Sequence, residues 1–158
     1  MALAESARKV QKELRARGID AEVVELPDST RTAIEAAQAI GCPVAQIVKS
    51  LVFRGAISGK PILIEASGVN RVNEESVAKI LGEAVVKADA DFVREKTGFA
   101  IGGIPPVGHA TEMGAVLIDE DLLQCSKLWA AAGTPHAVFP LTPAELVKIS
   151  NGKVISIK

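Results

Sequence analysis

One lysine stands out because of the strand on which it falls. Residues 47–54, IVKSLVFR, are mostly β-branched or apolar and predict a strand. Because side chains alternate along a strand, Lys49 shares its face with three apolar residues, which are Ile47, Leu51 and Phe53. A lysine on such a face either snorkels at the edge of a sheet or lies on the floor of a pocket. In a pocket, its ammonium could bind a phosphate or stabilise a developing oxyanion.

A segment rich in glycine and proline is the second candidate. Residues 98–109, GFAIGGIPPVGH, hold four Gly and two Pro, which predicts a shaped loop rather than a helix or strand. Glycine lets backbone N–H groups approach a ligand closely, so the amides of Gly102 and Gly103 could bind a carbonyl oxygen as an oxyanion hole does. The segment is neither GxGxxG nor a P-loop, and an ordinary turn is the alternative.

Other side chains give weaker signals. Neither His109 nor His136 belongs to a recognisable nucleophile motif, and GxSxG is absent from the sequence. Asp119 ends the expected strand AVLID, where it could face a ligand or cap the helical turn that follows. Cys42 and Cys125 lie far apart and do not form a CxxC. We therefore expect reduced packing cysteines, no metal site and no cofactor.

The elements that must position these residues mix helices with strands. Apolar spacing predicts an opening helix that ends at Gly18, and Ser29 or Thr30 is expected to cap a second helix that ends at Gly41. Further helices are expected over EESVAKIL, ADFVREK and PAELVKI. The expected strands are 20–26, 47–54, 61–67, 84–88, 115–119, 127–133, 136–141 and 153–158. This pattern indicates an α/β fold with a mixed sheet, whose core should include Trp129.

Composition bounds the class of protein. With 158 residues, of which 48% are hydrophobic and 3% aromatic, the chain should form one domain over residues 1–158. A net charge of −1 excludes a strongly basic nucleic-acid wrapper but permits contact with one end of an RNA. The sequence has no run of 18 apolar residues and no signal-peptide pattern, so we expect no membrane contact and a cytoplasmic protein.

The motifs, taken in order, resemble the YbaK/ProX family of free-standing aminoacyl-tRNA deacylases, which are related to the editing domain inserted in bacterial prolyl-tRNA synthetase. The resemblance spans residues 3–157, and the ordered set is more specific than any one motif. With Asp119 between the last two, the motifs are STRTAIEAAQAIG, QIVKSLVF, GKPILIEASGVNRVNEESVAKILG, TGFAIGGIPPVGH and WAAAGTPHAVFPLTPAEL.

The resemblance implies a fold, an activity and a set of site residues. The fold is a single compact α/β domain with a mixed, curved sheet and short flanking helices. The activity is hydrolysis of the ester between a wrong amino acid and the terminal ribose of a tRNA, most often tRNA(Pro). The family's key lysine matches Lys49, and its glycine loop, whose amides hold the substrate carbonyl, matches residues 102–106. No catalytic role is assigned to His136, because that position varies between subfamilies.

We therefore expect Lys49, Gly102 and Gly103 to be catalytic. The residues expected to bind substrate are Thr30, Ile47, Leu51, Phe53, Ile104, Pro105, Asp119 and His136. The apolar wall favours Ala or 2-aminobutyrate as the mischarged amino acid, with Cys second. The expected partners are the tRNA acceptor end, with its 3′-terminal aminoacyl-adenosine, and prolyl-tRNA synthetase.

Two other functions remain open at this point. The chain could be a catalytically inactive module of the same fold that binds a ligand or a synthetase. It could also hydrolyse a different small ester without any tRNA. The presence of both the lysine and the glycine loop argues against the inactive module.

Overall fold

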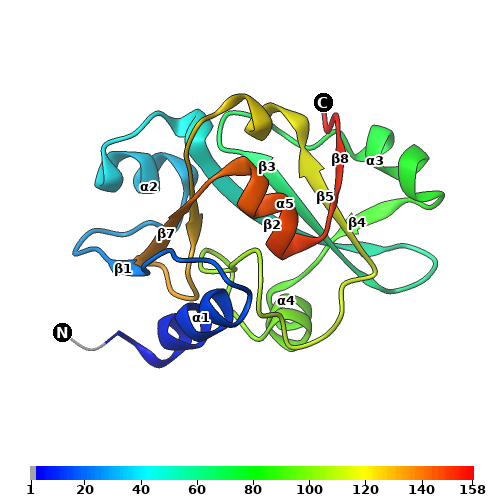
Figure 1. Cartoon of the computed structure of the whole chain (residues 1–158). Helices are drawn as coiled ribbons and strands as arrows, with labels where there is room; N and C mark the ends of the chain where they lie inside the picture. Colours follow the sequence, from blue (N-terminus) through cyan, green and yellow to red (C-terminus); the bar gives the residue numbers. More distant parts are fainter. Residues whose placement is uncertain (1–2) are drawn as a thin grey trace.

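The computed structural model describes residues 3–158, which form a mixed sheet flanked by short helices (Figure 1). The helices are α1 (Glu5–Ala16), α2 (Ala33–Ile40), α3 (Glu74–Leu81), α4 (Ala90–Thr97) and α5 (Pro143–Ser150), with 3-10 turns η1 (Val44–Gln46) and η2 (Glu120–Gln124). The strands are β1 (Val24–Glu25), β2 (Ile47–Gly55), β3 (Pro61–Ser67), β4 (Val85–Lys87), β5 (Ala115–Asp119), β6 (Leu128–Ala131), β7 (Ala137–Leu141) and β8 (Lys153–Ile155).

The strands pair in the order β1-β7-β6-β2-β3-β5-β8, with β4 attached to β2. The hairpin of β2 and β3 forms the centre of the sheet, with register pairs from Val48–Ser67 to Arg54–Pro61. β3 runs parallel to β5, and β5 runs parallel to β8. β6 runs parallel to β2 but antiparallel to β7. The expected α/β class with a mixed sheet is therefore confirmed.

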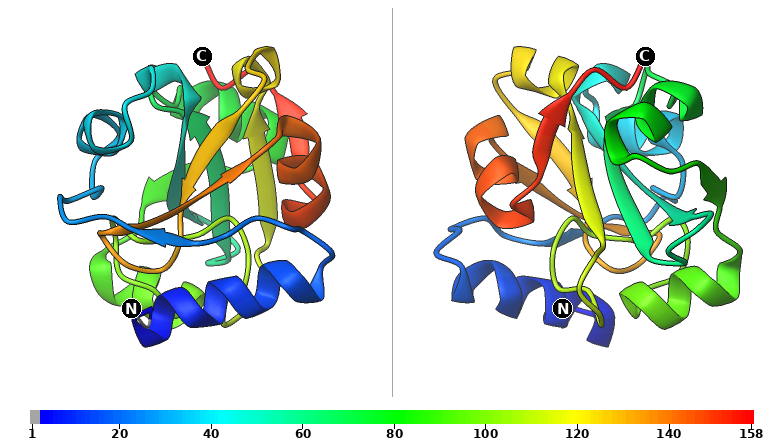
Figure 2. Two further views of the ribbon diagram at one scale, coloured as in Figure 1. Left: turned by 60° about the vertical axis from the view of Figure 1, so that its left-hand side comes forward. Right: turned by 90° about the vertical axis from the view of Figure 1, so that its right-hand side faces the viewer.

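Different helices cover the two faces of the sheet (Figure 2). On one face, α1 and α5 pack over the largest core cluster, to which β2 contributes Val48. On the opposite face, Val77 of α3 packs over β3, while Ala36 of α2 packs against Ile47. Lys49 lies on this second face, between the patch under α2 and the patch under α3.

Most helix caps follow the sequence, with one correction. Asn73, Asp89 and Thr142, which directly precede the expected helical segments, cap α3, α4 and α5. Neither Ser29 nor Thr30 caps α2. The cap is Thr32, which forms a capping box with the residue three positions on, Glu35.

The expected strand over residues 20–26 is also wrong, because only Val24–Glu25 pairs with another strand. The preceding residues bond to a helix side chain. The Val23 N–H donates to Gln11 Oε1, and Gln11 Nε2 donates to the Ala21 carbonyl, at 2.8 and 2.9 Å. A side chain of α1 therefore satisfies backbone groups that a neighbouring strand would otherwise have to pair.

Candidate active site

A gap in the pairing of β2 creates the site. One edge of β2 pairs with β3 from Val48 to Arg54. Its other edge pairs with β6 at Ile47 and Val48 and with β4 at 53–55. Within the described residues 3–158, residues 49–52 therefore have no strand partner on that edge. A cavity opens where β2 and β6 diverge, and we call it the fork cavity.

The fork cavity has a volume of about 250 Å³ and mainly apolar walls. β2 and β6 form its floor, α2 with the residues before it forms one side, and the glycine loop forms the other. Its lining residues are Thr30, Arg31, Thr32, Ala33, Ala36, Ile47, Val48, Lys49, Ser50, Leu51, Ile101, Gly102, Ile104, Trp129, Ala130, Ala131 and Val138.

Lys49 lies in the wall of this cavity and is half-buried. Its Nζ donates a hydrogen bond to the carbonyl oxygen of Asn70 at 2.5 Å. Burial lowers the pKa of the ammonium below its ordinary value, Arg71 lowers it further, and Asp119 acts in the opposite direction. Of the two placements that the sequence left open for Lys49, the structure shows the one in a cavity.

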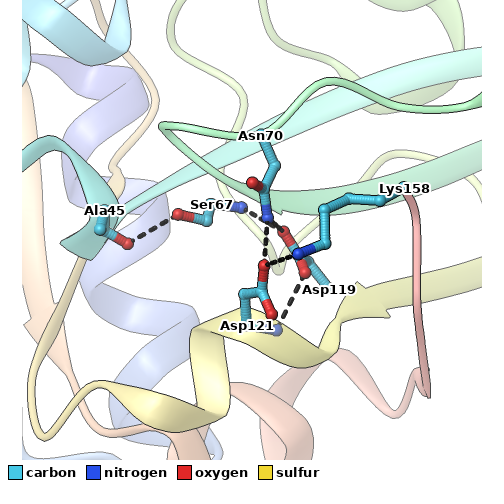
Figure 3. A network of polar contacts seen from close by, with 6 residues as sticks. All are labelled: Ala45, Ser67, Asn70, Asp119, Asp121 and Lys158. Carbon is cyan, nitrogen blue, oxygen red and sulfur yellow. Dashed lines mark hydrogen bonds and ion pairs between the residues drawn. The ribbon is translucent and has the colours of Figure 1, made fainter.

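A polar network holds the residue that binds Lys49 (Figure 3). The side-chain amide of Asn70 donates to Asp119 Oδ2 and to Asp121 Oδ2, at 2.8 and 2.7 Å. Asp119 also accepts from the backbone N–H of Ser67, and Asp121 forms an ion pair with Lys158 at 3.0 Å. The Asn70 carbonyl that receives the lysine is thus fixed by two carboxylates from the end of β5 and the start of η2.

The two glycines expected to donate amides lie in different surroundings. Gly102 lines the fork cavity with φ of +94°, and a Cβ built there would lie 2.5 Å from Cγ of Arg31. The N–H of Gly103 instead donates to the carbonyl of Ala100 at 3.1 Å. The carbonyl of Gly103 accepts from Gly133. An internal turn of the loop therefore occupies the Gly103 amide, and Gly102 remains the expected oxyanion donor that lines the cavity.

Two hydroxyl groups at the fork cavity lack a partner among residues 3–158. They are Oγ1 of Thr30, whose residue is only 5% exposed, and Oγ of Ser50. A buried hydroxyl without a hydrogen bond costs free energy, which a polar ligand in the cavity would recover. Thr30, which the sequence predicts to bind substrate, lies in the cavity wall.

Four expected substrate-binding residues lie outside the fork cavity. Phe53 lines the second cavity described below, whereas Pro105, Asp119 and His136 line neither. Asp119 is completely buried and caps η2, which was its alternative interpretation. His136 is exposed, and its Nδ1 lies 3.2 Å from the carbonyl oxygen of Leu26 and 3.1 Å from that of Asp28.

The sequence-based interpretation missed Arg31 and Trp129. Arg31 lies over Gly102 at the side of the fork cavity, and Trp129, expected in the core, is only half-buried and lines the cavity. Trp129 pairs in register with Ile47, which the sequence predicts to bind substrate. That pairing joins segments some 80 residues apart, and no local pattern indicates it.

A second cavity, of about 560 Å³, adjoins the first. We call it the basic cavity because Lys49, Arg71 and Lys87 line it, together with one acid, Glu74. Apolar residues complete its wall, and they are Val52, Phe53, Val72, Ala88 and Val93. The residues common to both cavities are Lys49, Ser50, Leu51, Ile101 and Ile104.

Metal-ligating side chains do not cluster in the described part of the chain. Within residues 3–158, no group of three His, Cys, Asp or Glu could hold a metal ion. Cys42 and Cys125 are free thiols that pack partly against the core, and burial raises the pKa of each. No helix in this range has the length and apolar character needed to cross a membrane.

The comparison with known families is decisive for the class of the protein. Residues 27–149, which include the lining of both cavities, match the model of the aminoacyl-tRNA editing domain. The chain belongs to this family. The resemblance to the YbaK/ProX proteins is thereby confirmed.

Individual relatives of this editing domain agree. The uncharacterized protein YwhH of Bacillus subtilis (strain 168) is 33% identical over 84% of the chain and 83% of its own length. Proline–tRNA ligase of Limosilactobacillus fermentum is 33% identical over 58% of the chain, which corresponds to 16% of the ligase. The crystal structure of a candidate trans-editing enzyme for prolyl-tRNA synthetase is 49% identical, covers 99% of both chains and superposes with a TM-score of 0.93.

Proposed function

We propose that this editing domain hydrolyses the ester of mischarged aminoacyl-tRNA, acting in trans on tRNA(Pro). The observation that carries the proposal is the position of Lys49 in the wall shared by two adjoining cavities. An aminoacyl ester has a small end and a nucleotide end, and its reacting carbonyl lies between them. A cation at the junction of a small apolar cavity and a larger basic one suits such a substrate.

The reaction requires little beyond binding and charge stabilisation. Water attacks the ester carbon, a new C–O bond forms, and the carbonyl oxygen becomes an oxyanion. When this intermediate collapses, the bond to the ribose oxygen breaks, and that oxygen takes the proton which the water gives up. The products are the free amino acid and uncharged tRNA. The neighbouring ribose hydroxyl of the substrate can position or activate the water.

Three groups of the fork cavity have roles in this scheme. The Lys49 ammonium stabilises the oxyanion or the adjacent phosphate, and the Gly102 N–H donates to the carbonyl oxygen. The unpartnered hydroxyl of Thr30 donates to, or accepts from, a polar group of the substrate. No covalent nucleophile is needed, since an aminoacyl ester is already activated.

The size and polarity of the fork cavity support a small amino acid. Its volume of about 250 Å³ lies below the ~300–1,000 Å³ of typical ligand pockets, so it suits a side chain rather than a nucleoside. Ile47, Leu51 and Ile104 give it apolar walls. We propose Ala or 2-aminobutyrate as the amino acid removed, followed by Cys. One methylene changes binding in such a cavity by about 1–3 kcal/mol.

The test is hydrolysis of tRNA(Pro) charged separately with Ala, 2-aminobutyrate, Cys, Ser or Pro. We expect rapid loss of the Ala or 2-aminobutyrate ester, with Pro spared. Lys49→Ala should abolish the loss, while Lys153→Ala on the remote strand β8 should not. If wild-type protein hydrolyses none of these esters above the spontaneous rate, and neither variant changes that rate, the chain is instead an inactive binding module. Competition by uncharged tRNA separates a tRNA substrate from a small ester.

A further inference from the structure

The basic cavity brings together three cations, of which Arg71 and Lys87 form no ion pair within residues 3–158. One acid, Glu74, also lines the cavity. Arg71 lies close enough to Lys49 to lower the pKa of its ammonium. Like charges gathered at a cavity repel one another, and a bound anion relieves that repulsion.

Hydrogen bonds fix the backbone segments that carry these cations relative to one another. Arg71 directly follows Asn70, whose carbonyl binds Lys49 and whose side chain is held by Asp119 and Asp121. Lys87 ends β4, where it pairs in register with Phe53 of β2. All three cations are therefore attached to β2 or to segments bonded to it. Their points of attachment are thus held on one side of the cavity, where an anion can draw the side chains together.

The two cavities also dictate the direction in which a substrate must extend. The fork cavity suits the aminoacyl group alone, and Lys49 lies in the wall where it meets the next cavity, so a nucleotide that leaves past Lys49 enters that cavity. The adjoining cavity on that side has about twice the volume and carries the unpaired cations. The first anionic group that such a substrate presents is the phosphodiester on the 5′ side of its terminal nucleoside.

We propose that the basic cavity binds this phosphodiester of the RNA 3′ end, through Arg71 and Lys87. The proposal rests on the proposed deacylase function for the identity of the RNA. The planar guanidinium of Arg71 can bond two phosphate oxygens at once, whereas Lys87 contributes a point charge. Phe53 and Val72 give the cavity an apolar wall beside these cations.

Binding of a minimal ligand by the full chain tests this site directly. The probes are the dinucleotide cytidylyl-(3′-5′)-adenosine, which carries the phosphodiester, and adenosine, which lacks it. Wild-type protein should bind the dinucleotide at least about tenfold more tightly than adenosine, the effect of one charge-assisted contact. Arg71→Ala and Lys87→Ala should each remove much of that difference and leave adenosine binding unchanged.

Both side chains are exposed, so these variants should fold, and Lys153→Ala provides a control with the same loss of charge. Equal binding of the two probes by wild-type protein would overturn the phosphate site. Equal weakening of both probes by the variants would overturn it as well.

The same experiment separates this inference from the proposed function. Protein that hydrolyses no aminoacyl ester, yet prefers the dinucleotide through Arg71 and Lys87, retains the phosphate site and loses the deacylase assignment. Protein that hydrolyses esters, yet binds both probes equally, remains a deacylase and loses the phosphate site.

Discussion

The surroundings of Lys49 lower the pH range over which its ammonium loses its charge. Burial and the nearby Arg71 both lower the pKa of its ammonium from the ordinary 10.5. If the charged form acts on the ester, enzymatic deacylation should fall as the pH rises through this lowered pKa. Values of kcat/KM measured against pH, after correction for spontaneous hydrolysis, should show this decline in deacylation below pH 10.5. Lys49→Arg, with a permanently charged guanidinium, should lose that alkaline fall. A profile for wild-type protein that stays flat to pH 10.5 would contradict the role of the charge.

Glu65 offers a stability test at the same scale. Its side chain is completely buried in β3, and burial raises its pKa well above the ordinary 4.5, opposed in smaller degree by the Ser150 hydroxyl. The folded state therefore keeps a proton that the unfolded state releases. The free energy of unfolding should then decrease as pH rises from 4.5 toward the folded pKa, by about 1.4 kcal/mol per pH unit.

Glu65→Gln is the matched variant, because an amide has the shape of the neutral acid and does not titrate. Urea denaturation between about pH 4 and 8 should show this decrease for wild-type protein and a smaller one for the variant. Identical pH dependence in both proteins would show that Glu65 does not carry the effect.

At the scale of elements, the loop after β3 positions Lys49. The Asn70 side chain bridges Asp119 and Asp121, so its removal frees the carbonyl that binds the lysine. We expect Asn70→Ala to lower kcat by about tenfold with little change in KM, because the ammonium loses its orientation. Lys158→Ala, at the exposed end of the network, should change both constants by less than about twofold.

The control for this prediction is structural. The thermal unfolding midpoint of Asn70→Ala should fall modestly, and lowering the assay temperature should leave the kcat deficit in place. A deficit that disappears with restored folding would mean that Asn70 acts through stability alone.

The elements also show what the sequence could and could not predict. Side-chain alternation on β2 is local, so it correctly placed Lys49 on one face of the strand with Ile47, Leu51 and Phe53. The fork cavity depends on which strands pair with β2 at its two ends, and that pairing is set by distant segments such as Trp129. The engaged amide of Gly103 and the buried Asp119 likewise follow from three-dimensional contacts that composition and spacing do not contain.

At the scale of the whole molecule, net charge limits how tRNA can bind. The chain carries 18 basic and 19 acidic residues, so only a local group of cations can meet the RNA. Each phosphate contact with a single strand contributes about −0.7 to the slope of log K against log salt. The basic cavity, which is proposed to hold one phosphodiester, predicts a slope of about −0.7 for binding of uncharged tRNA(Pro). A slope of about −4 or steeper, which implies six contacts, would contradict this local mode.

The central claim is that Lys49, at the junction of two cavities, makes this editing domain a deacylase. The most direct measurement is single-turnover hydrolysis of alanyl-tRNA(Pro) by wild-type protein, Lys49→Ala and the control Lys153→Ala. We predict rapid loss of the ester with wild-type protein and the control, and the spontaneous rate with Lys49→Ala. Full activity of Lys49→Ala in a folded protein would contradict the account.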